Sequence, residues 1–301
     1  MEERLAFGER DYPAVFTAAD LASKRAQLRY LNFTRCSLIL LVSGAGLAAL
    51  SPVFACLKSE LAVASSVAVA ASLLSTLYLK SQKPEHIWYG GRAVAESAKS
   101  MAWRYMTGAA PYEINIQAAD TDQKFVRELE SIIKEKAQLA FGFGGEFSAK
   151  PQISERMRAV RSAELGERIR IYTSGRISDQ RIWYGTQAKK NKDAERRYFF
   201  LVFASQLAAL IATIFLIHSS GSNLKLTGFF ASLASALMAW FQLKEHKGLA
   251  QSYSIAELEL GFIEEKSRYV TTEQEFSDFV TDAESAISRE HTLWIARRDR
   301  V

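Results

Sequence analysis

The sequence predicts an all-α membrane protein, in which four transmembrane helices form two hairpins and long helices extend into a cytoplasmic helical domain. Three observations predict it. Hydrophobic residues gather in uncharged blocks, and short connectors join these blocks in pairs. The whole chain has only 5 prolines, and outside the blocks it has no long strand-like alternation. The mean hydropathy of -0.05 hides the blocks, because all charged residues lie outside them. This clustering excludes an ordinary soluble globular protein.

Four segments contain no Asp, Glu, Lys or Arg. Their lengths come close to the roughly 17–25 residues that a helix needs to cross a hydrocarbon core of about 30 Å. We predict membrane spans at about residues 36–57, 61–79, 198–217 and 226–243. Only Lys58–Glu60 separates the first pair and only His218–Lys225 the second, so each pair is expected to be a hairpin.

Charge placement predicts the orientation, because Lys and Arg next to a span favour the cytoplasmic side. The two short loops hold only Lys58, Glu60 and Lys225 as charged residues. Basic residues instead cluster at the other ends of the spans, for example in Lys24–Arg35 and Lys189–Arg197. Both termini and the central region are therefore predicted to be cytoplasmic.

The regions outside the spans have helical patterns. A helix is expected from Thr121 to about Leu139, and a second helical stretch follows Ser154 as far as Tyr172. Residues 178–197 are expected to continue into the third span without a loop.

The tail is predicted to leave the fourth span as a helix from about Lys247. A break is expected near Thr271, and Thr272 with Glu275 has the spacing of a capping box that begins a final helix.

A weak internal repeat indicates two related halves. Lys24–Tyr30 precedes the first span and Lys192–Tyr198 precedes the third, with a similar order of residue types. Basic flanks recur at any membrane entry, so part of this match is generic. We predict two domains, residues 1–150 and 151–301, each with one hairpin.

Catalysis has little support in the sequence. The four histidines lie in separate segments without a metal-binding spacing, and no nucleophile or phosphate-loop motif is present. We expect no enzyme, cofactor or metal site. A basic stripe with aromatic stacking platforms is also missing, so no nucleic-acid partner is expected.

The interiors of the predicted spans lack ionisable groups, which disfavours an ion-coupled carrier. They contain small and hydroxyl-bearing residues instead. One face of the second span has Ser65, Val69, Ser72 and Thr76, and the fourth span has Ser232, Ser235 and Gln242. Two interpretations stay open. These faces form a close helix–helix seam, or several copies place them around an axis as the lining of a pore.

The segment after the first hairpin resembles a known family. The string Trp88–Lys99, then Trp103–Tyr105 and Pro111–Tyr112, is similar to the pattern of the SLATT proteins, the SMODS and SLOG-associating two-transmembrane effector domains. Residues 154–188 resemble the junction to a second such domain, and Phe279–Trp294 resembles its end. The resemblance covers nearly the whole chain as two tandem domains.

The resemblance implies a bacterial inner-membrane effector that oligomerises and permeabilises the membrane in nucleotide-signalled defence. Its expected partners are the lipid bilayer, further copies of the chain and an upstream nucleotide-signalling component. Trp88, Arg92, Glu96 and Trp103 are candidates for a cytoplasmic collar that gates the second span. The ordinary alternative for Arg92 and Glu96 is a surface ion pair four residues apart on a helix.

Two hypotheses of function follow. The first is a homo-oligomeric, pore-forming or channel-like effector gated through its cytoplasmic helices. The second is a non-conducting membrane scaffold that docks a cytoplasmic partner protein through residues 84–197, which hold 20 basic and 15 acidic residues.

Overall fold

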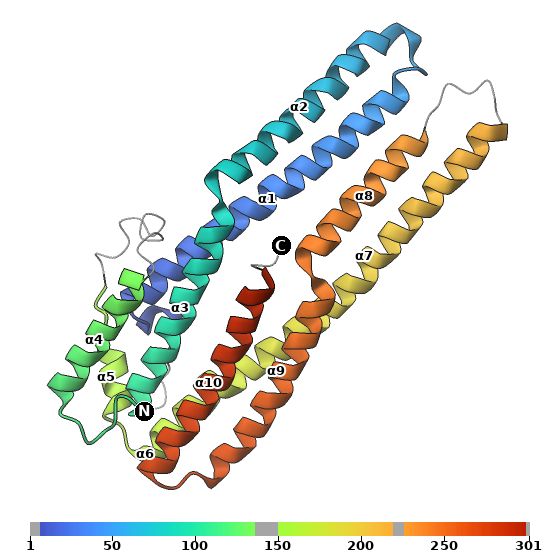
Figure 1. Ribbon diagram of the computed structural model, residues 1–301. Coiled ribbons are helices and arrows are strands. Elements are labelled where there is room, and N and C mark those ends of the chain that lie inside the picture. Colours follow the sequence, from blue (N-terminus) through green and yellow to red (C-terminus); the bar gives the residue numbers. More distant parts are fainter. Residues whose placement is uncertain (1–6, 136–149, 219–225, 299–301) are drawn as a thin grey trace. The chain divides into compact units, whose positions relative to one another are not determined.

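The computed structural model (Figure 1) describes residues 7–135, 150–218 and 226–298, with side chains as far as Ser288. Within these residues the chain is helical and has no β-strand. A π-helical turn, Thr173–Ser178, joins the helix Leu165–Tyr172 to the helix Asp179–His218. In chain order, the helices are α1 (Ala14–Leu50), α2 (Lys58–Gln82), α3 (Pro84–Thr107), α4 (Ala118–Glu135), α5 (Glu155–Arg161), α6 (Leu165–Tyr172), α7 (Asp179–His218), α8 (Leu226–Lys244), α9 (His246–Lys266) and α10 (Glu273–Arg298).

Four helical stretches are long and apolar enough to cross a membrane. Their most apolar windows have a mean hydropathy between 1.4 and 2.4, and at most 17% of any window is buried inside the chain. Outward-facing apolar side chains suit contact with lipid, whereas a soluble protein would bury them. The predicted all-α membrane fold with four transmembrane helices is confirmed. The stretches are Ala14–Leu50, Ala55–Gln82, Leu165–His218 and Leu226–Tyr269.

The chain divides into two compact units. The hairpin unit consists of Leu28–Pro84 and Ala188–Gln251 and contains the membrane-spanning parts of α1, α2, α7 and α8. The bundle unit consists of Met1–Gln27, Glu85–Gln187 and Ser252–Val301. Helices α1, α7 and α9 each contribute residues to both units, as the sequence predicted for the helix that leads into the third span.

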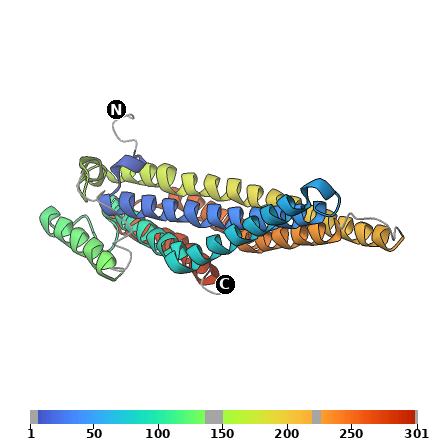
Figure 2. The same cartoon turned by 90° about the horizontal axis from the view of Figure 1, so that it is seen from above.

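In the hairpin unit, each pair of consecutive spans packs side by side (Figure 2). Helix α1 also contacts α8, because a Cβ atom on Gly46 would lie 3.3 Å from the Phe229 ring. The first helix ends at Leu50 rather than continuing to residue 57. Pro52 explains the difference, since proline disfavours helical geometry at and before its own position. A 3-10 turn, Ala55–Leu57, then leads into α2.

The two hairpins leave their second spans in the same way. Lys83 after α2 and Glu245 after α8 both have left-handed backbone conformations, with φ angles of 42° and 48°. The Lys83 N–H donates to the Leu79 carbonyl at 2.9 Å, and the Glu245 N–H donates to the Phe241 carbonyl at 3.2 Å. A new helix begins at the next residue in each case. This correspondence extends the weak repeat seen in the sequence.

The bundle unit has one hydrophobic core, built largely from aromatic side chains. Trp103 of α3, Tyr172 of α6 and Phe276 of α10 are buried at its centre. Gly91 lets α3 approach α1 closely, because a Cβ there would lie 3.1 Å from the Ala19 carbonyl oxygen.

Helix ends in the bundle unit follow two of the predicted signals. The Ser154 hydroxyl accepts a hydrogen bond from the Met157 N–H at 3.2 Å and begins α5. The predicted capping box at Thr272 and Glu275 is confirmed, with its two hydrogen bonds at 3.3 and 3.0 Å.

Two helix predictions in this unit have other outcomes. The helical stretch expected from Glu155 to Tyr172 is broken between α5 and α6. The expected helix end at Leu139 lies outside the described residues.

Candidate functional site

The hydroxyl face of the second span packs against α1 of the same hairpin. Ser72 Oγ lies 2.8 Å from Ser37 Oγ and donates to the Ser37 carbonyl oxygen at 3.1 Å. Ser65 Oγ donates to the Gly44 carbonyl oxygen at 2.8 Å. Thr76 Oγ1 is 3.4 Å from Ser37 Oγ. These contacts form a close helix–helix seam in which the hydroxyls are bonded across the hairpin.

Glycine makes this seam possible. A Cβ atom on Gly44 would lie 3.0 Å from a methyl group of Val69 and 3.3 Å from the Ser65 carbonyl oxygen. Val69 therefore occupies the space that a larger residue on α1 would need. All four candidates of the second span, Ser65, Val69, Ser72 and Thr76, lie on the side that contacts α1.

The second hairpin is held by polar contacts near both of its ends. Trp240 Nε1 donates to Tyr198 Oη at 3.0 Å, and Thr213 Oγ1 donates to Thr227 Oγ1 at 3.2 Å. These side-chain pairs fix α7 against α8 without any charged group.

An open groove with a volume of about 480 Å³ lies along α7 and α8. Gln206 and Gln242 are exposed beside it, and Ser235 satisfies its hydroxyl by donating to the Ala231 carbonyl oxygen at 2.9 Å. Four alanines and Met238 form the rest of its lining. Two of the predicted candidates, Ser235 and Gln242, thus share an uncovered surface. The third, Ser232, is half-buried on α8 and is not part of this groove.

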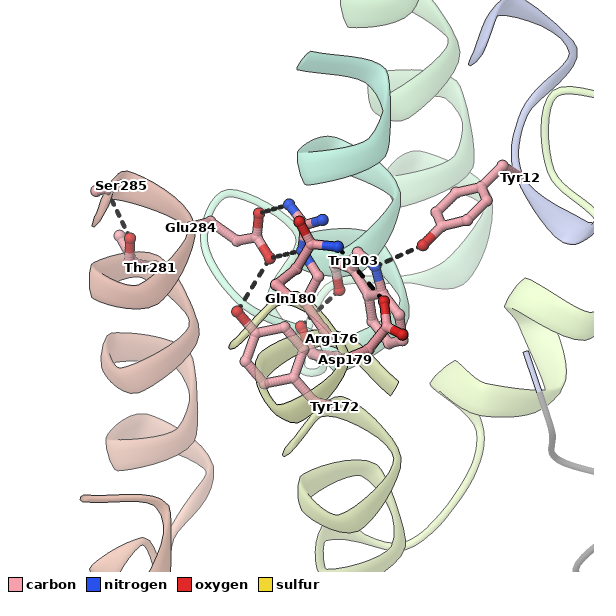
Figure 3. A network of polar contacts seen from close by, with 10 residues as sticks. Tyr12, Trp103, Tyr172, Arg176, Asp179, Gln180, Thr281, Glu284 and Ser285 are labelled. Atoms are coloured by element: carbon pink, nitrogen blue, oxygen red, sulfur yellow. Dashed lines mark hydrogen bonds and ion pairs between the residues drawn. The ribbon is translucent and has the colours of Figure 1, made fainter. Parts of the chain in front are cut away.

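A buried ion pair organises the bundle unit (Figure 3). Arg176, in the π-helical turn, donates from Nε and Nη2 to the two carboxylate oxygens of Glu284 on α10, at 2.9 and 2.8 Å. The side chains are 1% and 0% exposed. Tyr172 Oη donates to the same carboxylate at 3.0 Å. On the α3 side of the network, Trp103 Nε1 donates to Tyr12 Oη at 2.8 Å.

Burial and the neighbouring charge shift the pKa of Arg176 in opposite directions. Burial lowers the pKa of this guanidinium, but the charge and hydrogen bonds of Glu284 outweigh burial and raise it above its ordinary value. Burial also raises the pKa of the Tyr172 hydroxyl, and the negative charge of Glu284 adds to that effect. Arg176 is therefore charged and Tyr172 is a neutral donor throughout the physiological range.

A cavity of about 320 Å³ lies beside this ion pair, within the bundle unit. Its walls come from the start of α1, from α3, from the π-helical turn with the start of α7, and from α10. Arg92 and Glu96 of α3 line it as an ion pair with an N–O distance of 3.1 Å. Lys24 and Asp20 of α1 form a second pair at 2.6 Å. Arg176 faces the same space.

Two further buried arginines join α5 and α6 to the end of α3. Arg161 donates to the carbonyl oxygens of Tyr105 and Tyr112 at 2.8 and 2.7 Å. Arg168 donates to the Thr107 carbonyl oxygen at 2.6 Å and pairs with Glu273. Each guanidinium thus satisfies backbone carbonyls where helices end.

Two family models match the chain, one after the other. SMODS and SLOG-associating 2TM effector domain 3 matches residues 13–169, and SMODS and SLOG-associating 2TM effector domain 1 matches residues 172–294. The chain belongs to the SLATT family. The resemblance seen in the sequence is confirmed, and two SLATT effector domains with four membrane-spanning helices indicate a membrane effector of a defence system. No curated protein and no solved structure matches the chain.

Each SLATT match supplies one hairpin to the hairpin unit and its flanking helices to the bundle unit. Within the bundle unit, the Arg168–Thr107 contact joins residues of one match, whereas Tyr172 of the second match packs on Trp103 of the first with ring centres 5.6 Å apart. The domain boundary expected between residues 150 and 151 stays a prediction.

The four collar candidates of the first SLATT domain lie along α3 in different surroundings. Arg92 and Glu96 meet as an ion pair at the cavity, with side chains 38% and 24% exposed. Trp88 is buried, and its carbonyl oxygen accepts a hydrogen bond from Ser23 Oγ at 2.8 Å. Trp103 is part of the core beside the buried network. A gating role for these residues stays a prediction.

Sequence reasoning did not identify the ion pair Arg176–Glu284 or the cavity. One signal was available, because Glu284 falls on the apolar stripe of α10 with Val280 and Ile287, where a lone carboxylate needs a buried partner. The cavity had no comparable signal, since four distant segments form it. Within the described residues, no group of three metal-ligating side chains comes together.

Proposed function

We propose that this SLATT protein is a homo-oligomeric, channel-forming effector of the bacterial inner membrane. Both termini lie in the cytoplasm, and the cytoplasmic helices gate the channel in response to an upstream nucleotide-signalling component. The observation that carries the proposal is the open groove of α7 and α8, where Gln206, Ser235 and Gln242 gather beside small residues on an otherwise apolar surface.

Polar side chains exposed at membrane depth are costly in contact with lipid tails. Gln206 lies well inside α7, between apolar residues such as Phe203 and Leu210. Association of several copies would remove the groove from lipid and turn its amides and hydroxyl toward a shared axis. Small alanines would let the helices approach, and the polar groups would hydrate the path when it is open.

The proposal assigns different roles to the two sets of candidate residues. Ser65, Ser72 and Thr76 hold α2 on α1, and each has a hydrogen-bonding partner within the hairpin. Ser235 and Gln242, with Gln206, line the path. No catalytic step is part of the proposal.

The test is ion flux through the purified protein, reconstituted in liposomes and in planar bilayers. Ser235→Leu and Gln242→Leu should reduce the conductance, because leucine narrows and dries the path, while the oligomer stays intact. Ser66→Leu is the matched control. Ser66 is an exposed serine on α2 that donates only to its own helix, at 3.0 Å from the Ala62 carbonyl oxygen, so its replacement should leave the flux unchanged.

Two results would contradict the channel. One is a protein that forms a defined oligomer but gives no current or dye release at any protein-to-lipid ratio. The other is a current that Ser66→Leu reduces as strongly as Gln242→Leu does.

A second candidate function is a non-conducting scaffold for a cytoplasmic protein, and an exposed apolar stripe on α9 favours it. Ile255, Leu258 and Phe262 are 58%, 66% and 72% exposed and follow one helical face. A stripe of this kind commonly contacts another protein. Leu258→Glu with Phe262→Glu should then abolish co-purification of a stoichiometric partner, whereas a channel that uses only the α7–α8 groove should keep its conductance in this variant.

A further inference from the structure

We propose that the cavity beside Arg176 binds a small organic anion, whose oxyanion group contacts Arg176 Nη1 and Lys99 Nζ and whose planar ring stacks on Trp183. The oxyanion is a phosphate or a carboxylate, since both accept hydrogen bonds from this pair of donors. The inference does not rest on the proposed channel, because binding can be measured directly.

The first observation is an incompletely bonded cation. Arg176 is 1% exposed, and its Nε and Nη2 atoms are used by Glu284. The remaining nitrogen, Nη1, is buried and has no hydrogen-bond partner among the residues that the structure describes. A buried donor of a charged group without an acceptor is costly, and Arg176 lines the cavity. An oxyanion in the cavity would supply the missing acceptor.

The second observation is another positive charge in the same space. Lys99 of α3 lines the cavity, and its ammonium group lies 5.6 Å from the centre of the Tyr12 ring. Burial lowers the pKa of Lys99, and the positive charge of Arg176 lowers it further. Glu96, Glu284 and Asp179 act in the opposite direction on this pKa. The cavity thus places two positively charged donors close together, and an anion between them could accept hydrogen bonds from both.

The other charges of the cavity leave this anion site free. Asp20 pairs with Lys24 and Glu96 pairs with Arg92, so these acids are compensated locally. Asp179 lies at the exposed rim, where it accepts from Gln180 Nε2 at 3.4 Å. Glu9 also lines the cavity and is exposed. The acids of the cavity are therefore exposed or paired, whereas Arg176 is buried.

The rest of the lining suits a ring. Phe16, Tyr184 and Ile287 are buried apolar or aromatic wall residues, and Trp183 lies at the rim with 37% of its surface exposed. The volume of about 320 Å³ is at the lower end of the range typical of ligand sites. A molecule of mononucleotide size or smaller fits this volume, with its charged group inward and its ring at Trp183.

Isothermal titration calorimetry on the full-length protein in detergent tests the site. The probes are adenosine 5′-monophosphate for a phosphate with a ring, indole-3-carboxylate for a carboxylate with a ring, inorganic phosphate, and uncharged adenosine. We expect one of the ring-bearing anions to bind, and which one binds identifies the oxyanion. Adenosine should bind about ten-fold more weakly or worse, because a hydrogen bond to a charged group is worth at least about that factor.

Lys99→Met should weaken binding of that anion by about ten-fold or more, for the same reason. Trp183→Ala is the second variant, because it changes an exposed rim residue and leaves the buried charges in place. Trp183→Ala should weaken binding of the ring-bearing anion but leave binding of inorganic phosphate unchanged. Lys134→Met is the matched control, since Lys134 is an exposed lysine on α4, 72% exposed and paired with Glu130. It should bind as the wild-type protein does.

Three results would overturn the inference. The first is that neither ring-bearing anion binds at concentrations up to about 10 mM, ten times the dissociation constant of a weak ligand. The second is that adenosine binds as tightly as the monophosphate. The third is that Lys99→Met and Trp183→Ala both bind the anion like the wild type while they retain its thermal unfolding profile.

Discussion

Glu284→Gln should destabilise the bundle unit strongly. The substitution keeps the size of the side chain but removes the charge that compensates Arg176, and both side chains are at most 1% exposed. Breaking a buried ion pair by neutralising one partner costs about 3–5 kcal/mol, because the other charge stays buried without compensation. For a domain of this size, each kcal/mol lowers the melting temperature by about 2–4 °C. We expect a decrease of about 6–20 °C.

Thermal unfolding of the detergent-solubilised protein, followed by tryptophan fluorescence, measures this decrease. Trp103 is a suitable reporter because it is buried beside the network and bonded to Tyr12. The control is Glu265→Gln, because Glu265 pairs with Arg268 on the surface, where the side chains are 55% and 73% exposed. Such pairs contribute about 0–1 kcal/mol, so the control should change the melting temperature by only a few degrees.

A double variant separates lost charge compensation from lost packing. Arg176→Met with Glu284→Leu removes both charges and should recover much of the stability, because apolar residues of similar volume replace buried ion pairs well. The reasoning is refuted if Glu284→Gln melts within about 3 °C of the wild type. It is also refuted if the double variant is less stable than Glu284→Gln.

Three other substitutions test the helix contacts and ends, with thermal unfolding as the readout. Gly44→Val should destabilise the first hairpin by about 1–3 kcal/mol, because a Cβ there would lie 3.0 Å from a methyl group of α2; unchanged melting would contradict the seam. Glu275→Gln should destabilise the folded protein at pH 7. Hydrogen bonds from Thr271, then from Thr272, lower the pKa of Glu275, so its stabilisation is present above the unfolded value of about 4.3 and lost as the pH falls through the folded value. The difference between variant and wild type should therefore vanish at low pH, and a constant difference would argue against the cap. Lys83→Gly should stabilise the folded protein by roughly 0.5–1 kcal/mol, because glycine adopts a positive φ without strain. A loss of stability would show that the Lys83 side chain has another role.

Much of the fold could be predicted from local patterns. The absence of charge in the four blocks predicted the spans, and short connectors predicted their pairing into hairpins. The capping box at Thr272 and Glu275 marked a helix start to the residue, because its hydrogen bonds are made within four residues. The end of the first span was placed too late, since the apolar run continues past Pro52 although the helix does not.

The candidate site was predicted less well. Helical periodicity placed Ser65, Ser72 and Thr76 on one face but left open what that face contacts. The structure shows α1 of the same hairpin there, at Ser37 and Gly44.

The sequence by itself determined the membrane spans, their hairpin pairing and the family, because each depends on composition or on short-range order along the chain. Only the tertiary structure decided that Arg176 meets Glu284, 108 residues away, and that α1, α3, α7 and α10 enclose a cavity beside them. The physical reason is that hydrophobicity and helix signals act over a few turns. A buried charge, in contrast, finds its partner only after distant helices have packed together.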